Sequence, residues 1–100
     1  MNASGQEWIE RICIPADHPS LPGHFPGEPV IAGVILLDRL AALLEREGRG
    51  VIKRIAAVKF RAPLLPGEEA ELQVAVTLGQ VRFRVLRNPE ILASGEAELA

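Results

Sequence analysis

Alternation of apolar and polar residues dominates the second half of the chain. Between residues 70 and 78 the apolar set is Ala70, Leu72, Val74, Val76 and Leu78. Residues 81–87 alternate in the same way, with arginines on the outward side. A period of two residues predicts half-buried β-strands. The pair Gly79-Gln80 between the two runs predicts a two-residue hairpin turn and therefore antiparallel pairing.

Three further strands are predicted from short runs of β-branched and apolar residues, over residues 8–14, 51–61 and 91–99. The sequence L-P-G-E follows the second of these, and Asn88-Pro89 turns the chain before the last. Because the last four strands are joined by short turns, we expect them to form an antiparallel meander.

A different pattern predicts one helix over residues 34–46, which Gly33 precedes and Gly48 follows. Its sequence, V-I-L-L-D-R-L-A-A-L-L, is apolar on almost every side, which is typical of a helix buried on most of its faces. A long central apolar helix wrapped by a curled antiparallel sheet of about five strands is an α+β layer structure. We expect residues 1–100 to form this single domain.

Composition narrows the classes of protein to which the chain can belong. Its 100 residues include 48% apolar residues, and 11 basic against 13 acidic residues give a net charge of −2. This balance does not favour nucleic-acid binding. The single cysteine, Cys13, excludes an internal disulfide and a cysteine-based zinc site. The first residues show no signal peptide and no apolar run is long enough to span a membrane, so we expect a soluble, cytoplasmic protein.

Residues 15–33 stand apart because they hold five of the eight prolines. Prolines at every third or fourth position stiffen a backbone, and a long loop in a small domain is more often functional than a linker. His24 lies in this segment and is a candidate general base near neutral pH, although an ordinary surface histidine fits equally well. His18 is expected at the surface. With Asp17 as the acid beside His18, the two histidines do not predict a metal site.

Asp38 lies in the middle of the predicted apolar helix. The residues three and four positions from it cannot pair with a carboxylate: Val34, Ile35, Ala41 and Ala42. A desolvated carboxyl without a partner stays protonated and can act as a general acid. Two alternatives remain open, namely an ion pair with a strand arginine and exposure beside Arg39.

Gly33 is the third candidate, because it precedes the helix. The first N–H groups of a helix have no intrahelical partner and carry partial positive charge, which suits a carbonyl oxygen that gains negative charge. Glycine allows a ligand to approach the backbone closely, although glycine before a helix is common. A base, an acid and an oxyanion site together suit removal of a proton α to a carbonyl and loss of a β-hydroxyl.

The stretch G-H-F-P-G-E-P-V-I-A-G-V-I-L-L-D, from Gly23 to Asp38, resembles the active-site loop and helix of the hot-dog-fold 3-hydroxyacyl-acyl-carrier-protein dehydratases of the FabA/FabZ type. Their pattern places an acidic residue five positions after the glycine, where this chain has Asp38. V-K-F-R-A-P-L-L-P-G-E and A-S-G-E-A-E-L resemble later strands of the same family. The similarity covers most of the chain and is strongest over residues 23–38 and 58–68.

This resemblance implies syn elimination of water from a 3-hydroxyacyl thioester to give a trans-2-enoyl thioester. His24 would be the base at C2, Asp38 would protonate the departing hydroxyl, and the Gly33 N–H would hold the thioester oxygen. Phe25, Val34 and Leu37 would bind the acyl group in an apolar tunnel. Phosphopantetheine on an acyl-carrier protein would deliver that group, with no metal or free cofactor. The family also implies a homodimer or higher homo-oligomer, with the histidine of one subunit beside the acid of the other.

The chain departs from the family pattern at two positions, one before the predicted helix and one within it, and in length. Ala32 and Ala42 stand where proline and glutamine are usual. We also expect the chain to lack the extra N-terminal helix and strand of larger members. A hot-dog thioesterase or hydratase and a non-catalytic acyl-binding subunit of a synthase complex are the alternative functions. Five basic residues between residues 49 and 61, and arginines at 82, 84 and 87, suit an acidic carrier protein or simply a well-solvated sheet.

Overall fold

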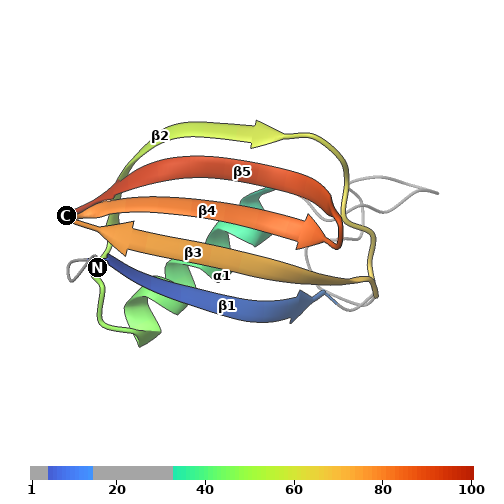
Figure 1. Cartoon of the computed structure of the whole chain (residues 1–100), viewed down its shortest axis with the longest axis horizontal. Coiled ribbons are helices and arrows are strands. Elements are labelled where there is room, and N and C mark those ends of the chain that lie inside the picture. The colour runs from blue at the N-terminus through green and yellow to red at the C-terminus, as the bar shows by residue number, and fades with distance from the viewer. Residues whose placement is uncertain (1–4, 15–32) are drawn as a thin grey trace.

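The computed structural model describes residues 5–14 and 33–100, and these form five strands and one helix (Figure 1). The elements, in chain order, are β1 (Gly5–Cys13), α1 (Gly33–Arg46), β2 (Ile52–Phe60), β3 (Glu69–Thr77), β4 (Gln80–Arg87) and β5 (Glu90–Leu99). Each element predicted from the sequence is present, and its ends lie within three residues of the predicted ones.

The strands form one antiparallel sheet in the order β1-β3-β4-β5-β2. Strands β3, β4 and β5 are the expected meander, but the prediction that β2 continues it is wrong. Instead, β2 pairs with β5 at one edge, while β1 pairs with β3 at the other. The connection over residues 61–68 is long enough to cross the end of the sheet, and its Leu64 is buried in the core. Strands β1 and β2 are therefore the two edges.

The hairpin between β3 and β4 turns at Leu78-Gly79, one residue earlier than predicted. Both residues have positive φ, 52° and 76°, as in the type I′ turn that matches the twist of a hairpin. Glycine adopts this conformation freely, whereas Leu78 does so at a steric cost. The Leu78 side chain is 82% exposed, so its position in the turn follows from the register of the strands and not from burial.

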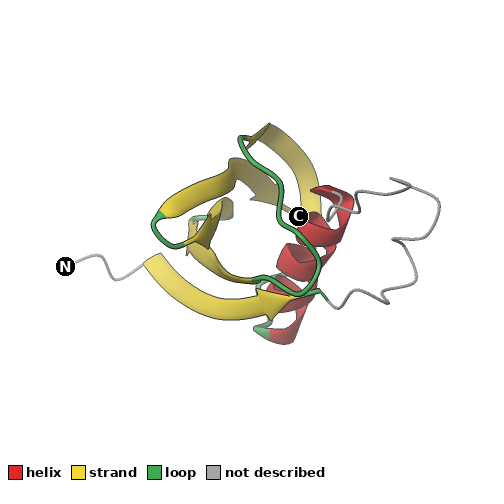
Figure 2. Ribbon diagram, turned by 90° about the vertical axis from the view of Figure 1, so that its right-hand side faces the viewer, coloured by secondary structure: helices red, strands yellow, loops and turns green. Residues whose placement is uncertain are grey.

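Helix α1 lies in the concave side of the curled sheet, which does not close round it (Figure 2). Its buried residues form one face and contact the sheet: Ile35, Leu36, Leu40, Leu43 and Leu44. Its other face is exposed: Asp38, Arg39, Ala41, Ala42, Glu45 and Arg46. The expectation of a long helix buried on most sides is thus wrong for the single chain. The helix has 14 residues, and two of its apolar residues are alanines, which expose little apolar surface.

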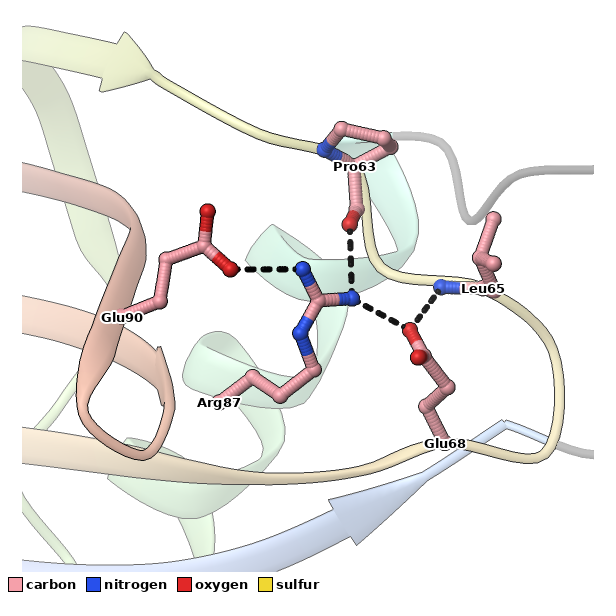
Figure 3. Close-up of polar contacts among 5 residues, drawn as sticks. All are labelled: Pro63, Leu65, Glu68, Arg87 and Glu90. Atoms are coloured by element: carbon pink, nitrogen blue, oxygen red, sulfur yellow. Dashed lines mark hydrogen bonds and ion pairs between the residues drawn. The ribbon is translucent and has the colours of Figure 1, made fainter.

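Arg87 links the connection over residues 61–68 to the turn between β4 and β5 (Figure 3). Its guanidinium donates to Glu68 Oε1 at 2.6 Å, to Glu90 Oε1 at 2.7 Å and to the Pro63 carbonyl at 3.4 Å. Glu68 Oε1 also accepts the Leu65 N–H at 2.9 Å. The Leu65 N–H and, after it, the Arg87 guanidinium hold the pKa of Glu68 below its ordinary value. These contacts fix the path of the chain between β2 and β3.

The Glu68→Gln variant is expected to be less stable than the wild type at neutral pH, with a difference that shrinks in acid. A lowered folded-state pKa stabilises the fold above the unfolded pKa, and that contribution is lost as pH falls through the folded pKa. The unfolding free energies of the two proteins should therefore converge as pH falls below the ordinary pKa of glutamate. Urea unfolding at several pH values measures this. Glu45→Gln, on the exposed face of α1, is the matched control, and a pH-independent difference for Glu68→Gln would contradict the interpretation.

Candidate functional site

Gly33, the first residue of α1, lies under the aromatic ring of Phe60 at the end of β2. A Cβ placed on Gly33 would lie 2.5 Å from Cζ and 2.8 Å from Cε1 of that ring, so only glycine allows this contact. Phe60 is still 53% exposed. The N-terminus of the helix and the end of an edge strand thus meet at one place. Sequence analysis missed this role for Phe60, because the contact joins segments that local pattern does not relate.

The Gly33→Ala variant should lose activity more than stability. The new methyl group displaces the Phe60 ring, which is half-exposed and can swing away, so we expect the melting temperature to change by no more than about 5 °C. The displaced ring and the methyl group crowd the first helical N–H, and kcat/KM should fall at least about tenfold. Thermal melts and steady-state rates on the assay given below check this. Adding Phe60→Leu should restore part of the rate, and unchanged kinetics in Gly33→Ala would contradict a role of the Gly33 N–H in the reaction.

Asp38 lies on the exposed face of α1, five residues after Gly33. The apolar environment expected for its carboxyl is not present in the single chain. Among the ion pairs between described residues none includes Asp38, so the structure matches the alternative of exposure beside Arg39. The reason is that larger apolar residues of the helix face the sheet, while Ala41 and Ala42 leave the carboxyl open. Of the predicted substrate-binding residues, Leu37 is half-buried and packs against the core.

The remaining predicted site residues are not placed by the structure. His24 and Phe25 lie outside the described residues, as do His18 and Ala32, and the Val34 side chain is likewise not described. The structure thus brings together Gly33, Leu37 and Asp38 on one helix. The approach of His24 to Asp38 stays a prediction.

An open groove of about 840 Å³ lies on the outer face of the sheet, which is the face opposite α1. Its polar residues pair with one another across the strands. Arg82 lies 3.7 Å from Glu96, and Arg84 donates to Gln73 at 2.7 Å. These contacts favour the simpler interpretation of the two arginines, as residues that solvate the outer face. The groove is separated by the sheet from Gly33 and Asp38.

Within residues 5–14 and 33–100, no group of three or more His, Cys, Asp or Glu side chains is arranged to hold a metal ion. In the same part of the chain no helix has the length and apolar character needed to cross a membrane.

Comparison with known proteins identifies the family. The family model described as ApeI-like, ApeI dehydratase, matches residues 1–96. The chain belongs to the ApeI-like dehydratase family. The FabZ 3-hydroxyacyl-[acyl-carrier-protein] dehydratase of Haemophilus influenzae (strain PittEE) is 38% identical over 82 residues, covering 70% of this chain and 55% of the relative. The FabZ of Acetivibrio thermocellus is 31% identical over 106 residues, covering 92% of this chain and 71% of the relative. This ApeI-like chain spans about half the length of the Haemophilus relative that it matches.

Solved structures show the fold of this ApeI-like chain. The dehydratase heterocomplex ApeI:P from Xenorhabdus doucetiae matches with a TM-score of 0.84 at 20% identity, covering 98% of this chain and 95% of that one. An uncharacterized Erwinia carotovora protein matches with a TM-score of 0.82 at 22% identity, covering 100% and 87%. A fluoroacetyl-CoA-specific thioesterase, FlK, matches with a TM-score of 0.65 at 17% identity, covering 95% of this chain and 84% of that one. The expected hot-dog fold is therefore confirmed in its five antiparallel strands and one helix, and this fold occurs with more than one chemistry.

Proposed function

We propose that this protein removes water from a 3-hydroxyacyl thioester on an acyl-carrier protein and forms a trans-2-enoyl thioester. The observation that carries the proposal is the dehydratase family match over residues 1–96, since it spans both Gly33 and Asp38. Identity to FabZ enzymes supports the same reaction. A thioesterase is the less favoured alternative, because its support is structural similarity at 17% identity.

Each proposed role follows from the chemistry of elimination. His24 removes the proton at C2 of the acyl group, and Asp38 donates a proton to the hydroxyl at C3, which leaves as water while the C2–C3 double bond forms. The thioester oxygen gains negative charge as the C2 proton leaves. The Gly33 N–H, at the positive end of α1, donates a hydrogen bond to it. Phe25, Val34 and Leu37 bind the acyl chain.

A second subunit is part of this proposal, because Asp38 is exposed in the single chain. A general acid acts in a site from which bulk water is excluded, and a subunit that covers the exposed face of α1 would enclose the Asp38 carboxyl in this way. The sequence-based expectation is a homodimer in which His24 of one copy reaches Asp38 of the other. The ApeI:P structure is titled a heterocomplex, which makes a non-identical second subunit the other candidate.

The carrier protein, the absence of a free cofactor and a cytoplasmic location also belong to the proposal. Elimination by an acid and a base requires neither metal nor redox chemistry. An acidic carrier protein suits the basic residues between residues 49 and 61. A lone cysteine is compatible with a reducing compartment.

The test is incubation of the purified protein with a 3-hydroxyacyl-carrier-protein thioester, followed by mass spectrometry of the intact carrier. Loss of one water from the acyl group is the predicted result. Release of free carrier thiol would identify a thioesterase instead. Binding without any change in mass would identify an acyl-binding subunit, and either of these two outcomes would refute the proposed reaction.

A further inference from the structure

Phe60 is a large aromatic residue that the hydrophobic core does not use. It lies two residues after Val58 in β2, so both side chains are on the face of the strand that is turned toward α1. Val58 packs against the core, whereas Phe60 is not among the residues that form or adjoin it and stays 53% exposed. An aromatic ring stabilises a fold most when it is fully buried, so core packing does not explain the position of Phe60.

The end of the Phe60 ring points at the first residue of α1. Among the described residues, the three atoms nearest to a Cβ placed on Gly33 are Cζ, Cε1 and Cε2 of Phe60, at 2.5, 2.8 and 3.1 Å. These three carbons form the tip of the ring, so the ring meets the helix end-on. Because a Cβ is a methyl carbon here, the space beside the Gly33 Cα has no room for a methyl group while the ring keeps this position.

The sheet fixes the backbone that carries the ring. Phe60 lies opposite Ala93 of β5 in the strand register. The N–H groups of Arg61 and Ala62 both donate to the Leu92 carbonyl, at 2.8 and 3.3 Å, and Ala62 packs against the core. The ring can therefore leave the helix N-terminus only by rotation of its own side chain.

A thioester bound at Gly33 brings its C2 close to this ring. In the proposed reaction the thioester oxygen accepts the Gly33 N–H. Such a hydrogen bond and the C=O bond place the carbonyl carbon about 4 Å from the nitrogen, and C2 is one bond further. The other neighbour of the carbonyl carbon is sulfur, which carries the pantetheine chain and cannot branch. C2 is thus the position next to the carbonyl at which acyl groups can differ in width.

We propose that Phe60 is a specificity-determining residue, which accepts acyl groups with an unbranched C2 and disfavours those with a methyl group at C2. An unbranched C2 carries two hydrogens, of which the base removes one while the other fits beside the ring. A methyl group in place of that second hydrogen must share the space at the tip of the ring. The selection rests on the proposed function, since it requires the thioester oxygen at Gly33.

The first test measures binding of saturated thioesters, which have no hydroxyl to lose. Isothermal titration calorimetry gives the Kd of butanoyl-pantetheine and of both C2 epimers of 2-methylbutanoyl-pantetheine. We expect the wild type to bind each branched epimer at least about tenfold more weakly, a usual effect of one methyl group in a fitted site. In Phe60→Ala and Phe60→Leu, whose side chains do not reach Gly33, at least one epimer should bind within about threefold of the unbranched thioester.

Ile9→Ala is the matched control for these variants. Ile9 is a 69% exposed apolar residue of β1, at the other edge of the sheet, so its removal should leave the preference of the wild type unchanged. Because Phe60 adds little to the core, both of its variants should fold, and thermal melts of all four proteins check this.

The second test makes the same comparison for the reaction, with 3-hydroxybutanoyl and 2-methyl-3-hydroxybutanoyl carrier-protein thioesters. The branched substrate would lose its one hydrogen at C2 and the hydroxyl at C3 as water and give a 2-methyl-2-enoyl thioester. Phe60→Ala should raise the ratio of kcat/KM for the branched substrate to that for the unbranched one by at least about tenfold relative to the wild type.

Equal binding of branched and unbranched thioesters by the wild type would overturn the proposal, as would a preference that both Phe60 variants retain. Loss of the preference in Ile9→Ala, or no binding of any of these thioesters, would overturn it too. Since the saturated thioesters cannot lose water, the binding preference is measured whether or not the protein is a dehydratase. Dehydration of the unbranched substrate can in turn occur without any preference, so failures of the two proposals are distinguishable.

Discussion

We expect the Asp38→Asn variant to lose about a hundred- to ten-thousand-fold of kcat for dehydration, which is the usual contribution of a general acid. Asparagine keeps the size of the side chain but cannot donate the proton that the leaving hydroxyl needs. Because Asp38 is exposed on α1 and forms no ion pair with described residues, its replacement should leave the melting temperature of the single chain nearly unchanged. Rates with a 3-hydroxyacyl-carrier-protein thioester, alongside thermal melts, measure both effects.

Arg39→Gln is the matched control for this prediction, since Arg39 is the adjacent exposed residue of the same helix. Its rate should stay within a few-fold of the wild type. His24→Ala should lose activity to a similar extent as Asp38→Asn, because base and acid act in one elimination. Retention of near-wild-type rates by either His24→Ala or Asp38→Asn would contradict the roles assigned here.

The second large effect that we expect is a loss of stability when Gly95 of β5 is replaced by alanine. A Cβ at this position would lie 2.5 Å from the Ala57 carbonyl oxygen and 2.7 Å from Cζ of Phe83. The carbonyl belongs to the neighbouring strand β2 and Phe83 is 4% exposed, so neither group can move without disturbing the sheet or the core. We expect Gly95→Ala to cost about 2–3 kcal/mol of unfolding free energy, and the melting temperature to fall by roughly 10–20 °C.

Ser94→Ala, changed at the adjacent position of β5, should alter the stability by much less. Urea unfolding of both variants measures the difference. The Gly95→Ala/Phe83→Leu double variant should recover only part of the loss, because the contact with the Ala57 carbonyl remains. A Gly95→Ala protein as stable as the wild type would show that β2 and β5 are spaced differently from the structure described here.

The strands and the helix were predictable from the sequence because their residue periods are strong and local. Alternation over residues 70–78 and 81–87 reflects strands with one buried face, as β3 and β4 have. Glycines near both ends of α1 indicated its bounds, and the predicted start of the helix lies within one residue of the observed one. These signals come from residues that are close together in the sequence, so they can be recognised without knowledge of the fold.

Features that depend on contacts between distant segments were not predictable in the same way. Local pattern does not show that β2 crosses to pair with β5, since a short connection and a crossing one look alike along the chain. The contact of Phe60 with Gly33 depends on that crossing. The sequence also left the environment of Asp38 open between desolvation, an ion pair and exposure, because an apolar helical sequence does not reveal which side the sheet covers. For the site as a whole, Gly33 and Asp38 lie on one helix as expected, while the position of His24 stays a prediction.

The most direct test of the central claim runs the reaction in reverse, in water labelled with heavy oxygen. The purified protein is incubated with a trans-2-enoyl-carrier-protein thioester, and the carrier and any released acid are analysed by mass. The account predicts that the acyl group, still attached to the carrier, gains one labelled hydroxyl at C3, and that Asp38→Asn abolishes this gain. Heavy oxygen in a released free acid, or no labelled hydroxyl on the carrier-bound chain, would contradict it.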